Sequence, residues 1–134
     1  MKLIQYVTAH IALMTIMKKE FPYAVAFRLV ELKRRIAPKV EFYAEEERKL
    51  VERFAVKDDK GKPIINGSNF ECAGSDPAEV AANVREYERL KQELCAVPDD
   101  EPSPGVKVKL PEDALISPEV IESLDGFIEF EVAE

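Results

Sequence analysis

The sequence predicts a mainly helical α+β fold. It should have three to four helices, including a long kinked helical hairpin, and a small antiparallel β element near the C-terminus. Three observations predict this. Apolar residues recur at helical spacing through much of residues 1–96. Three proline-containing signals, at Pro22, Pro77 and Pro118, are typical of helix starts. The residues from Val106 to Leu110 alternate between apolar and charged. Because 134 residues are the size of one ordinary domain, we expect a single domain over 1–134.

Three parts of this domain differ in composition. Residues 1–96 form the mainly helical part, with a turn and hairpin expected at 57–72. Residues 97–105 hold three prolines and three acidic residues without periodicity, which is typical of a linker. Residues 106–134 form an acidic part in which a strand, a short helix and a second strand are expected.

A first helix is expected from about Thr8 to Lys19. Thr8 is a good N-cap residue because its hydroxyl can accept a hydrogen bond from the first helical turn. Pro22 ends this helical stretch, since the residue before a proline avoids helical dihedral angles. The expected apolar stripe is Ile11, Met14 or Leu13, and Met17.

A long helix is expected next, beginning at Pro22 and covering about 23–55. Its first half has a clear apolar face, which Ala26 and Val30 widen. Pro38 either kinks this helix or separates it from the next one. The residues of the apolar face are Val25, Leu29, Leu32 and Ile36.

The second half of this helix, about 39–55, has a less regular inner face. Glu47 interrupts that face, and Glu45 and Lys49 have the spacing of a favourable ion pair. The helix is expected to pack against the first helix and against a later one at 77–95. The residues of the inner face are Val40, Tyr43, Leu50 and Phe54.

A turn, a short hairpin and another helix should follow. The turn is Lys57-Asp58-Asp59-Lys60-Gly61-Lys62. The pair Asn66-Gly67 indicates a hairpin turn between Pro63-Ile64-Ile65 and the segment 69–72. Asp76-Pro77-Ala78-Glu79 starts a helix that runs to about Cys95, because it combines a cap acid, a first-turn proline and a glutamate. The apolar stripe of that helix is Val80, Val84, Tyr87 and Leu94.

The C-terminal part predicts two strands around a short helix. The alternation at 106–110 indicates a half-buried strand. Ser117-Pro118-Glu119 begins a helix of one or two turns that Gly126 ends. The segment 127–132 offers a partner for the first strand.

No catalytic, cofactor-binding or metal-binding residue is predicted. Nucleotide-binding, hydrolase and zinc-protease motifs are missing, and a small enzyme of unfamiliar type has no positive feature in its favour. Cys72 and Cys95 are expected to be reduced thiols rather than a disulfide, and His10 a core or interface residue. The apolar stretch at 3–17 is too short for a membrane span, so we interpret it as a buried or interface element, with a signal peptide as the alternative.

Charge divides the chain unevenly. Residues 1–40 contain eight basic and two acidic side chains, whereas residues 97–134 contain two lysines and eleven acidic side chains. The net charge is −7, which does not favour general nucleic-acid binding because that needs a cationic surface. Lys33, Arg34, Arg35 and Lys39 form only a small basic patch.

The order of these segments resembles a group of short uncharacterised proteins encoded by tailed phages and prophages. In that group a Leu/Phe-Pro step precedes an Ala-Phe/Tyr-x-Leu helix, an Asp-x-x-Gly turn follows, and Ser-Pro stands near the end. This chain departs from the group at Phe54-Ala55, where the group has Tyr-Gly, and over 66–75. The matching segments are Phe21 to Leu29, Tyr43 to Leu50, the turn at 57–62, Ile116 to Glu119, and Leu124 to Ile128.

The resemblance implies a phage-encoded accessory or virion-associated protein, in the cytoplasm of an infected cell or incorporated in a virion. We expect it to act without catalysis, by binding another protein or a second copy of itself. The alternative is an acidic inhibitor of a host nucleic-acid-binding or defence protein, with carboxylates that imitate a phosphate array. The candidate partner-binding residues are Arg28, Arg34, Arg35, Asp99, Asp100, Glu101, Glu112 and Asp113.

Overall fold

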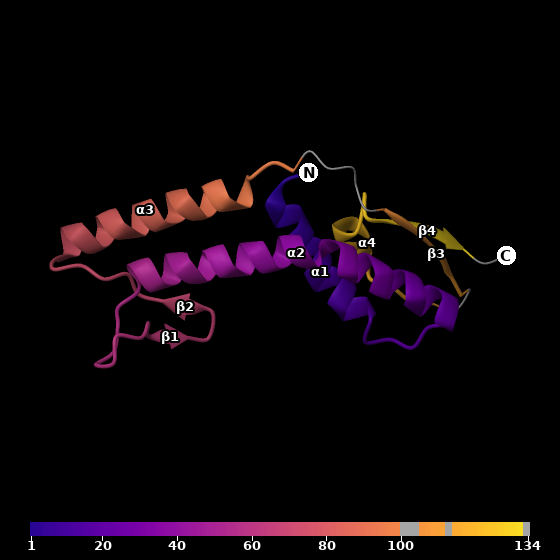
Figure 1. Ribbon diagram of the computed structural model, residues 1–134, viewed down its shortest axis with the longest axis horizontal. Coiled ribbons are helices and arrows are strands. Elements are labelled where there is room, and N and C mark those ends of the chain that lie inside the picture. The colour runs from indigo at the N-terminus through magenta and orange to yellow at the C-terminus, as the bar shows by residue number, and fades with distance from the viewer. Residues whose placement is uncertain (100–104, 112–113, 133–134) are drawn as a thin grey trace. The chain divides into compact units, whose positions relative to one another are not determined.

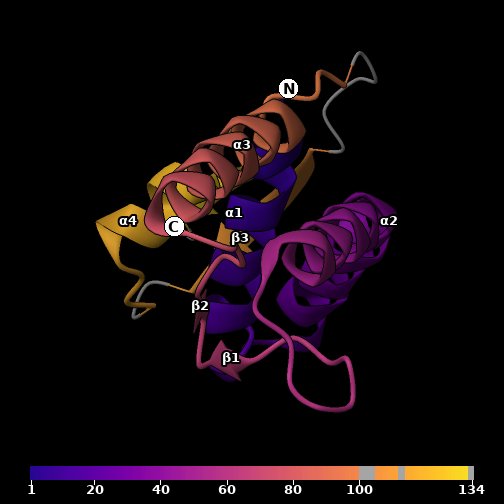
Figure 2. The same ribbon diagram turned by 90° about the vertical axis from the view of Figure 1, so that its left-hand side faces the viewer.

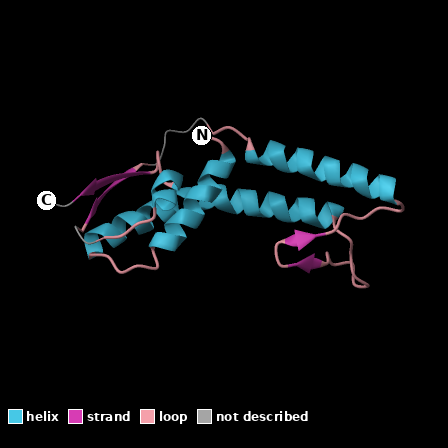
Figure 3. Ribbon diagram, turned by 180° about the vertical axis from the view of Figure 1, so that it is seen from behind, coloured by secondary structure: helices cyan, strands magenta, loops and turns pink. Residues whose placement is uncertain are grey.

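The computed structural model describes residues 1–99, 105–111 and 114–132. Helices dominate these residues, accompanied by two pairs of short strands (Figures 1 and 3). The mainly helical α+β prediction is therefore confirmed. In chain order the elements are α1 (Leu3–Ile16), α2 (Tyr23–Phe54), β1 (Ile65–Asn66), β2 (Asn69–Phe70), α3 (Pro77–Cys95), β3 (Val106–Leu110), α4 (Pro118–Ser123) and β4 (Ile128–Val132).

The chain forms two compact units. The first unit combines Met1–Glu41 with Pro98–Glu134, and the second is Phe42–Val97. Helix α2 contributes its first part to the first unit and its second part to the second. It is a single helix with Pro38 inside it, so the proline does not separate two helices.

Helix α1 differs from its prediction in both its bounds and its buried face. It begins at Leu3, where the side chain of Gln5 accepts a hydrogen bond from the N–H of Lys2 (2.6 Å), and Thr8 lies inside it. The stripe expected inside includes Ile11, which is 63% exposed. The segment is apolar on nearly every side, so spacing alone does not select the inner face. The buried residues of α1 are Leu3, Tyr6, Ala9, Ala12, Leu13 and Ile16.

The apolar stripe predicted for the first half of α2 is confirmed and forms part of the core of the first unit. All four of its members are buried, and Leu32 and Ile36 have no exposed surface. They join residues of α1, β3 and the segment around α4 in one apolar cluster. Within it, Tyr6 packs edge-on against Phe127, with 5.5 Å between ring centroids.

The strands of the first unit correct one prediction. The expected C-terminal pair exists, but β3 and β4 are parallel, with Val106 opposite Ile128 and Leu110 opposite Val132. The physical reason is the helix between them. After β3 the chain must return to the level where β3 began before β4 can run parallel to it. The segment that contains α4 makes this return. Ser117 caps α4 through the N–H of Glu119 (3.2 Å).

In the second unit, the second part of α2 and helix α3 lie side by side and antiparallel (Figure 1). Phe54 packs edge-on against Tyr87, with 6.0 Å between ring centroids. Glu47, which interrupts the inner face of α2, forms an ion pair with Lys91 of α3. The polar residue on that face therefore has a partner on the neighbouring helix.

Two local predictions in α2 and α3 have different outcomes. The expected Glu45–Lys49 pair is replaced by pairs at a spacing of three, in which Glu45 bonds Arg48 and Lys49 bonds Glu46 (3.1 Å). The start of α3 is as predicted, since Asp76 accepts a hydrogen bond from the N–H of Glu79 (2.8 Å).

The turn that follows α2 forms as expected, and a hairpin follows it with its own turn displaced from the predicted position (Figure 2). Asp58 accepts hydrogen bonds from the N–H groups of Lys60 (2.8 Å) and Lys62 (3.0 Å). Strands β1 and β2 are antiparallel, with Asn66 opposite Asn69. The hairpin turn therefore lies at Gly67-Ser68, one residue later than predicted, and Gly67 has the positive φ of 65° that this turn requires.

Candidate protein-interaction face

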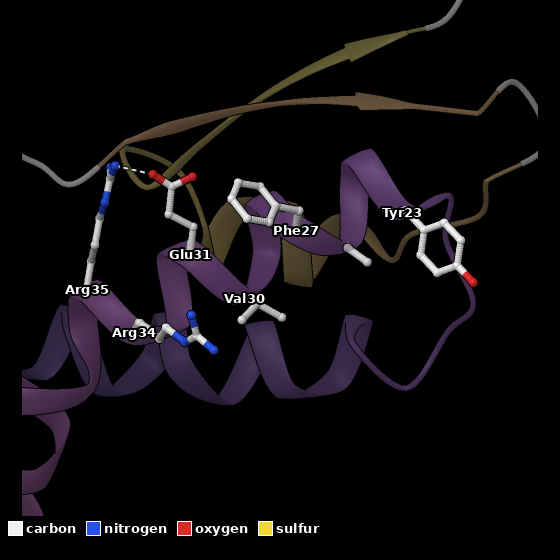
Figure 4. Close-up of a pocket in the computed structure, with 7 residues that line it drawn as sticks. Tyr23, Phe27, Val30, Glu31, Arg34 and Arg35 are labelled. Carbon is white, nitrogen blue, oxygen red and sulfur yellow. Dashed lines mark hydrogen bonds and ion pairs between the residues drawn. The ribbon is translucent and has the colours of Figure 1, made fainter.

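The first part of α2 carries a second row of large side chains, separate from the row in the core. Tyr23 is 95% exposed and Phe27 is 65% exposed, while Val30 is half-buried. Their spacing of four and three residues places them on one side of the helix, as Figure 4 shows. They line an open hollow of about 710 Å³. We call its lining the α2 face: Tyr23, Ala26, Phe27, Val30, Glu31, Arg34 and Arg35.

Charged side chains border one end of the α2 face. Glu31 lies between two arginines. It bonds Arg35, as Figure 4 shows, and it also bonds Arg28 at 3.1 Å. Arg34 is exposed, and among the described residues it forms no ion pair. The three arginines outnumber the one carboxylate, so this border is cationic.

The composition of the α2 face is typical of protein-binding surfaces. Tyrosine, phenylalanine and arginine are enriched where proteins meet, because they offer a large contact area with few rotatable bonds or strong directional hydrogen bonds. An exposed phenylalanine beside an exposed tyrosine leaves apolar surface in water, which a partner would remove.

The structure brings together some of the predicted partner-binding residues and separates others. Arg34 and Arg35 line the α2 face, and Arg28 reaches it through Glu31. Asp99 does not. Its carboxylate forms an ion pair with Lys39 (3.2 Å), and its side chain is only 14% exposed. Four predicted residues lie outside the described residues: Asp100, Glu101, Glu112 and Asp113.

Asp99 also holds the start of the chain. Its N–H donates to the carbonyl of Met1 (2.7 Å), and the N-terminal ammonium donates to the carbonyl of Asp99 (3.0 Å). These contacts and the Lys39 pair indicate a structural role within the first unit.

Sequence reasoning missed the aromatic residues of the α2 face. The apolar spacing predicts Val30 at the edge of the core and predicts no role for Tyr23 or Phe27. A signal for them exists in the sequence. Residues 23, 27 and 30 repeat the spacing of the core residues 25, 29 and 32, displaced by two positions. Two positions turn a helix by about 200°, so one row faces the core and the other faces water.

The second unit contains a polar cluster between α2 and α3. The hydroxyl of Tyr43 lies 3.8 Å from the thiol of Cys95, and Glu47 pairs with Lys91. Burial raises the pKa of Tyr43 to about 12. Burial alone would raise the pKa of Glu47, but hydrogen bonds from Lys91 and Tyr43 outweigh it and lower that pKa. The cluster joins two helices, and every group in it has a partner.

The described part of the chain gives little support for a reactive cysteine, a metal site or a membrane-spanning helix. Cys72 and Cys95 are free and half-buried, and burial raises the pKa of the Cys72 thiol, which makes it less reactive. Across residues 1–99, 105–111 and 114–132, no group of three His, Cys, Asp or Glu residues is placed to hold a metal ion. Nor does any helix in these ranges combine the length and apolar character that crossing a membrane requires.

Comparisons with protein-family models, with curated proteins and with solved structures find no match to this chain.

Proposed function

We propose that this protein acts without catalysis, by binding another protein through the α2 face, as an accessory or virion-associated protein of a tailed phage. The observation that carries the binding role is the exposed row of Tyr23, Phe27 and Val30 on α2. The phage context is supported by the sequence resemblance alone.

The charges around the α2 face select the kind of partner. Arg28, Arg34 and Arg35 surround a single carboxylate, Glu31. A partner segment with apolar anchors at helical spacing and flanking aspartate or glutamate would satisfy both the apolar row and this cationic border. We therefore propose an acidic amphipathic helix as the bound segment.

The test is affinity capture by the tagged full chain from phage-infected cells, with mass spectrometry of the bound proteins. Phe27→Ser removes an aromatic anchor that the core does not use. Leu115→Ser is the matched control, since Leu115 is 81% exposed in the same unit but does not line the α2 face. We expect Phe27→Ser to reduce capture of a capsid, neck or tail protein at least tenfold, and the control to retain it.

Capture that survives Phe27→Ser unchanged, or no capture of a phage structural protein, would show that the α2 face has no such role. The proposed charge selection has its own test. Arg34→Glu should weaken the same capture, and raising the salt concentration should weaken it further.

The alternative proposal is an acidic inhibitor of a host nucleic-acid-binding or defence protein. It predicts capture of a basic host protein, lost at high salt and indifferent to Phe27→Ser. Asp99 gives little support to this alternative, because its carboxylate already forms an ion pair with Lys39.

A further inference from the structure

Strand β3 has one edge without a neighbouring strand. In the part of the chain that the structure describes, β3 pairs only with β4, and the two run parallel. In a parallel pair, every second residue of a strand directs its N–H and C=O toward the neighbour. The N–H of Val106 donates to the carbonyl of Phe127 (2.9 Å), so residues 106, 108 and 110 face β4. Lys107 and Lys109 therefore direct their backbone groups toward the open edge.

These backbone groups have no partner among the described residues. No hydrogen bond within residues 1–99, 105–111 and 114–132 involves the N–H or C=O of Lys107 or Lys109. A row of unpaired backbone donors and acceptors is a template for another extended segment. The two lysines offer their donors and acceptors at a spacing of about 7 Å, which is the two-residue repeat of an extended chain.

A groove runs along this open edge. The start of α2 lines one side of it, and β3 lines the other, with a volume of about 460 Å³. Among the described residues, β4 contributes none to the lining, so the groove lies on the side of β3 that faces away from β4. We call it the edge groove. Its lining includes Ala24, Val25, Arg28, Lys107, Val108 and Lys109.

The two faces of β3 determine which side chains an added strand must carry. Val108 is buried on the inner face, in the same apolar cluster as Val25. Lys107 and Lys109 are exposed on the outer face. Neighbouring strands place residues of the same face side by side. An added strand therefore needs apolar residues on its inner face, in alternation with acidic residues beside the lysines.

The two lysines are able to bind further carboxylates. Neither forms an ion pair with a described residue, although Glu129 and Glu131 lie opposite them on β4. A strand at the open edge would lie on the other side of β3, so each lysine would then have a carboxylate on both sides. Arg28 adds nothing to this selection, because it already bonds Glu31.

We propose that the edge groove binds an extended segment of another protein, which adds to β3 as a third strand and alternates apolar with acidic residues. The unpaired backbone groups select an extended segment, since a helix uses its own N–H and C=O groups internally. The lysines disfavour a second copy of β3, because lysine would then lie opposite lysine. The edge groove shares no lining residue with the α2 face, so it is a second binding site of the first unit.

The first experiment measures binding of two capped peptides to the full chain by isothermal titration calorimetry. The acidic peptide is Ser-Val-Glu-Val-Glu-Val-Ser, and the basic peptide has lysine in place of both glutamates. We expect the acidic peptide to bind at concentrations below about 1 mM, and to bind at least about tenfold more tightly than the basic one. Both peptides have the same apolar residues, so the difference reports the charge selection.

Hydrogen exchange of single amides, followed by NMR, shows where the acidic peptide binds. In the free protein the amides of Lys107 and Lys109 should exchange faster than that of Val108, because only Val108 directs its N–H toward β4. At saturation with the acidic peptide, exchange at both lysine amides should slow at least about tenfold. Exchange at Val108 should change little.

Two substitutions at one position separate the backbone from the charge. Lys109→Pro removes an N–H that faces the groove but leaves the bonds of Val108 and Leu110 to β4 in place. Lys109→Gln removes the charge and retains the N–H. We expect the proline variant to bind the acidic peptide at least about tenfold more weakly, and the glutamine variant about threefold more weakly. Far-UV circular dichroism confirms that both variants keep the fold.

Failure of the acidic peptide to bind would overturn the proposal, as would equal binding of the two peptides. Binding that leaves exchange at Lys107 and Lys109 unchanged would do the same. So would self-association of the full chain that Lys109→Pro abolishes, since a second copy would then occupy the edge. The α2 face keeps its own test by capture, so failure of one proposal is distinguishable from failure of the other.

Discussion

Two neighbouring residues of α2 test whether its two faces have the roles that we assign to them. Leu29 is buried in the core of the first unit, whereas Phe27, two residues earlier, is mostly in water. Replacing each by alanine should have opposite consequences for stability and for binding. Both substitutions lie within one helix, two residues apart, so the rest of the chain is the same in the comparison.

The expected magnitudes follow from burial. Leu29→Ala removes three carbons from a closed core. The lost burial of these carbons lowers the free energy of unfolding by about 2.4 kcal/mol, and the cavity that they leave lowers it further. The total expected loss is about 2.7 to 5 kcal/mol. About a third of Phe27 is buried, so Phe27→Ala loses about 0.5 to 1 kcal/mol of apolar burial. Alanine recovers up to about 0.7 kcal/mol through its higher helix propensity.

The assay is urea unfolding followed by circular dichroism. The free energies of unfolding are compared between variants whose dependence on urea concentration has the same slope. If the two units unfold separately, the loss should lie in the transition of the first unit. Equal losses for the two variants, or a larger loss for Phe27→Ala, would refute the assignment of the two faces. The proposed binding face would then be part of the core.

Three further predictions concern stability. Folding lowers the pKa of Glu47, so its carboxylate stabilises the fold above its unfolded pKa of about 4.5, and this contribution disappears as the pH falls through the folded value. In Glu47→Gln the free energy of unfolding should therefore fall less steeply as the pH is lowered. The difference should be less than about 1 kcal/mol, because the ion pair with Lys91 is partly exposed. Gly126→Ala should cost about 1 to 2 kcal/mol in thermal unfolding, because φ is +83° there and the new Cβ would lie 2.9 Å from Cε of Met1. Asp76→Ala should cost about 1 kcal/mol through loss of the α3 cap, with Asp76→Asn as the control that retains it; no difference between the two would contradict the cap assignment.

Elements with strong local signals were predicted well from the sequence. The four core residues of α2, the Asp76 cap and the alternating strand β3 each rest on a pattern of at most twelve residues. In such patterns the hydrogen bonds and the apolar periodicity belong to the segment itself, so no distant residue is needed to interpret them.

Features that depend on distant segments were not predicted. The inner face of α1 is set by the side chains packed against it, and its apolar residues on every side conceal that choice. The parallel pairing of β3 and β4 depends on how the crossing segment packs. The role of Glu47 depends on Lys91, which lies 44 positions later.

The candidate site was predicted in part. The arginines were identified by charge, which is visible in the sequence, whereas Tyr23 and Phe27 depend on which side of α2 faces the core. Asp99 was identified by charge as well, yet it has a structural partner in Lys39. Charge alone does not distinguish a charged side chain that can bind another protein from one that is already paired within the chain.

The position of Pro38 has a consequence for the order in which the chain folds. A proline donates no hydrogen bond, so helix growth that reaches it from either side loses a bond before it gains another. Pro38 divides α2 into two segments of nearly equal length and lies only a few residues from the boundary between the two units. Each segment is therefore expected to form together with its own unit. The joining of the two halves into one helix would then be a late step, visible in hydrogen exchange as two cooperative blocks of amides that open independently.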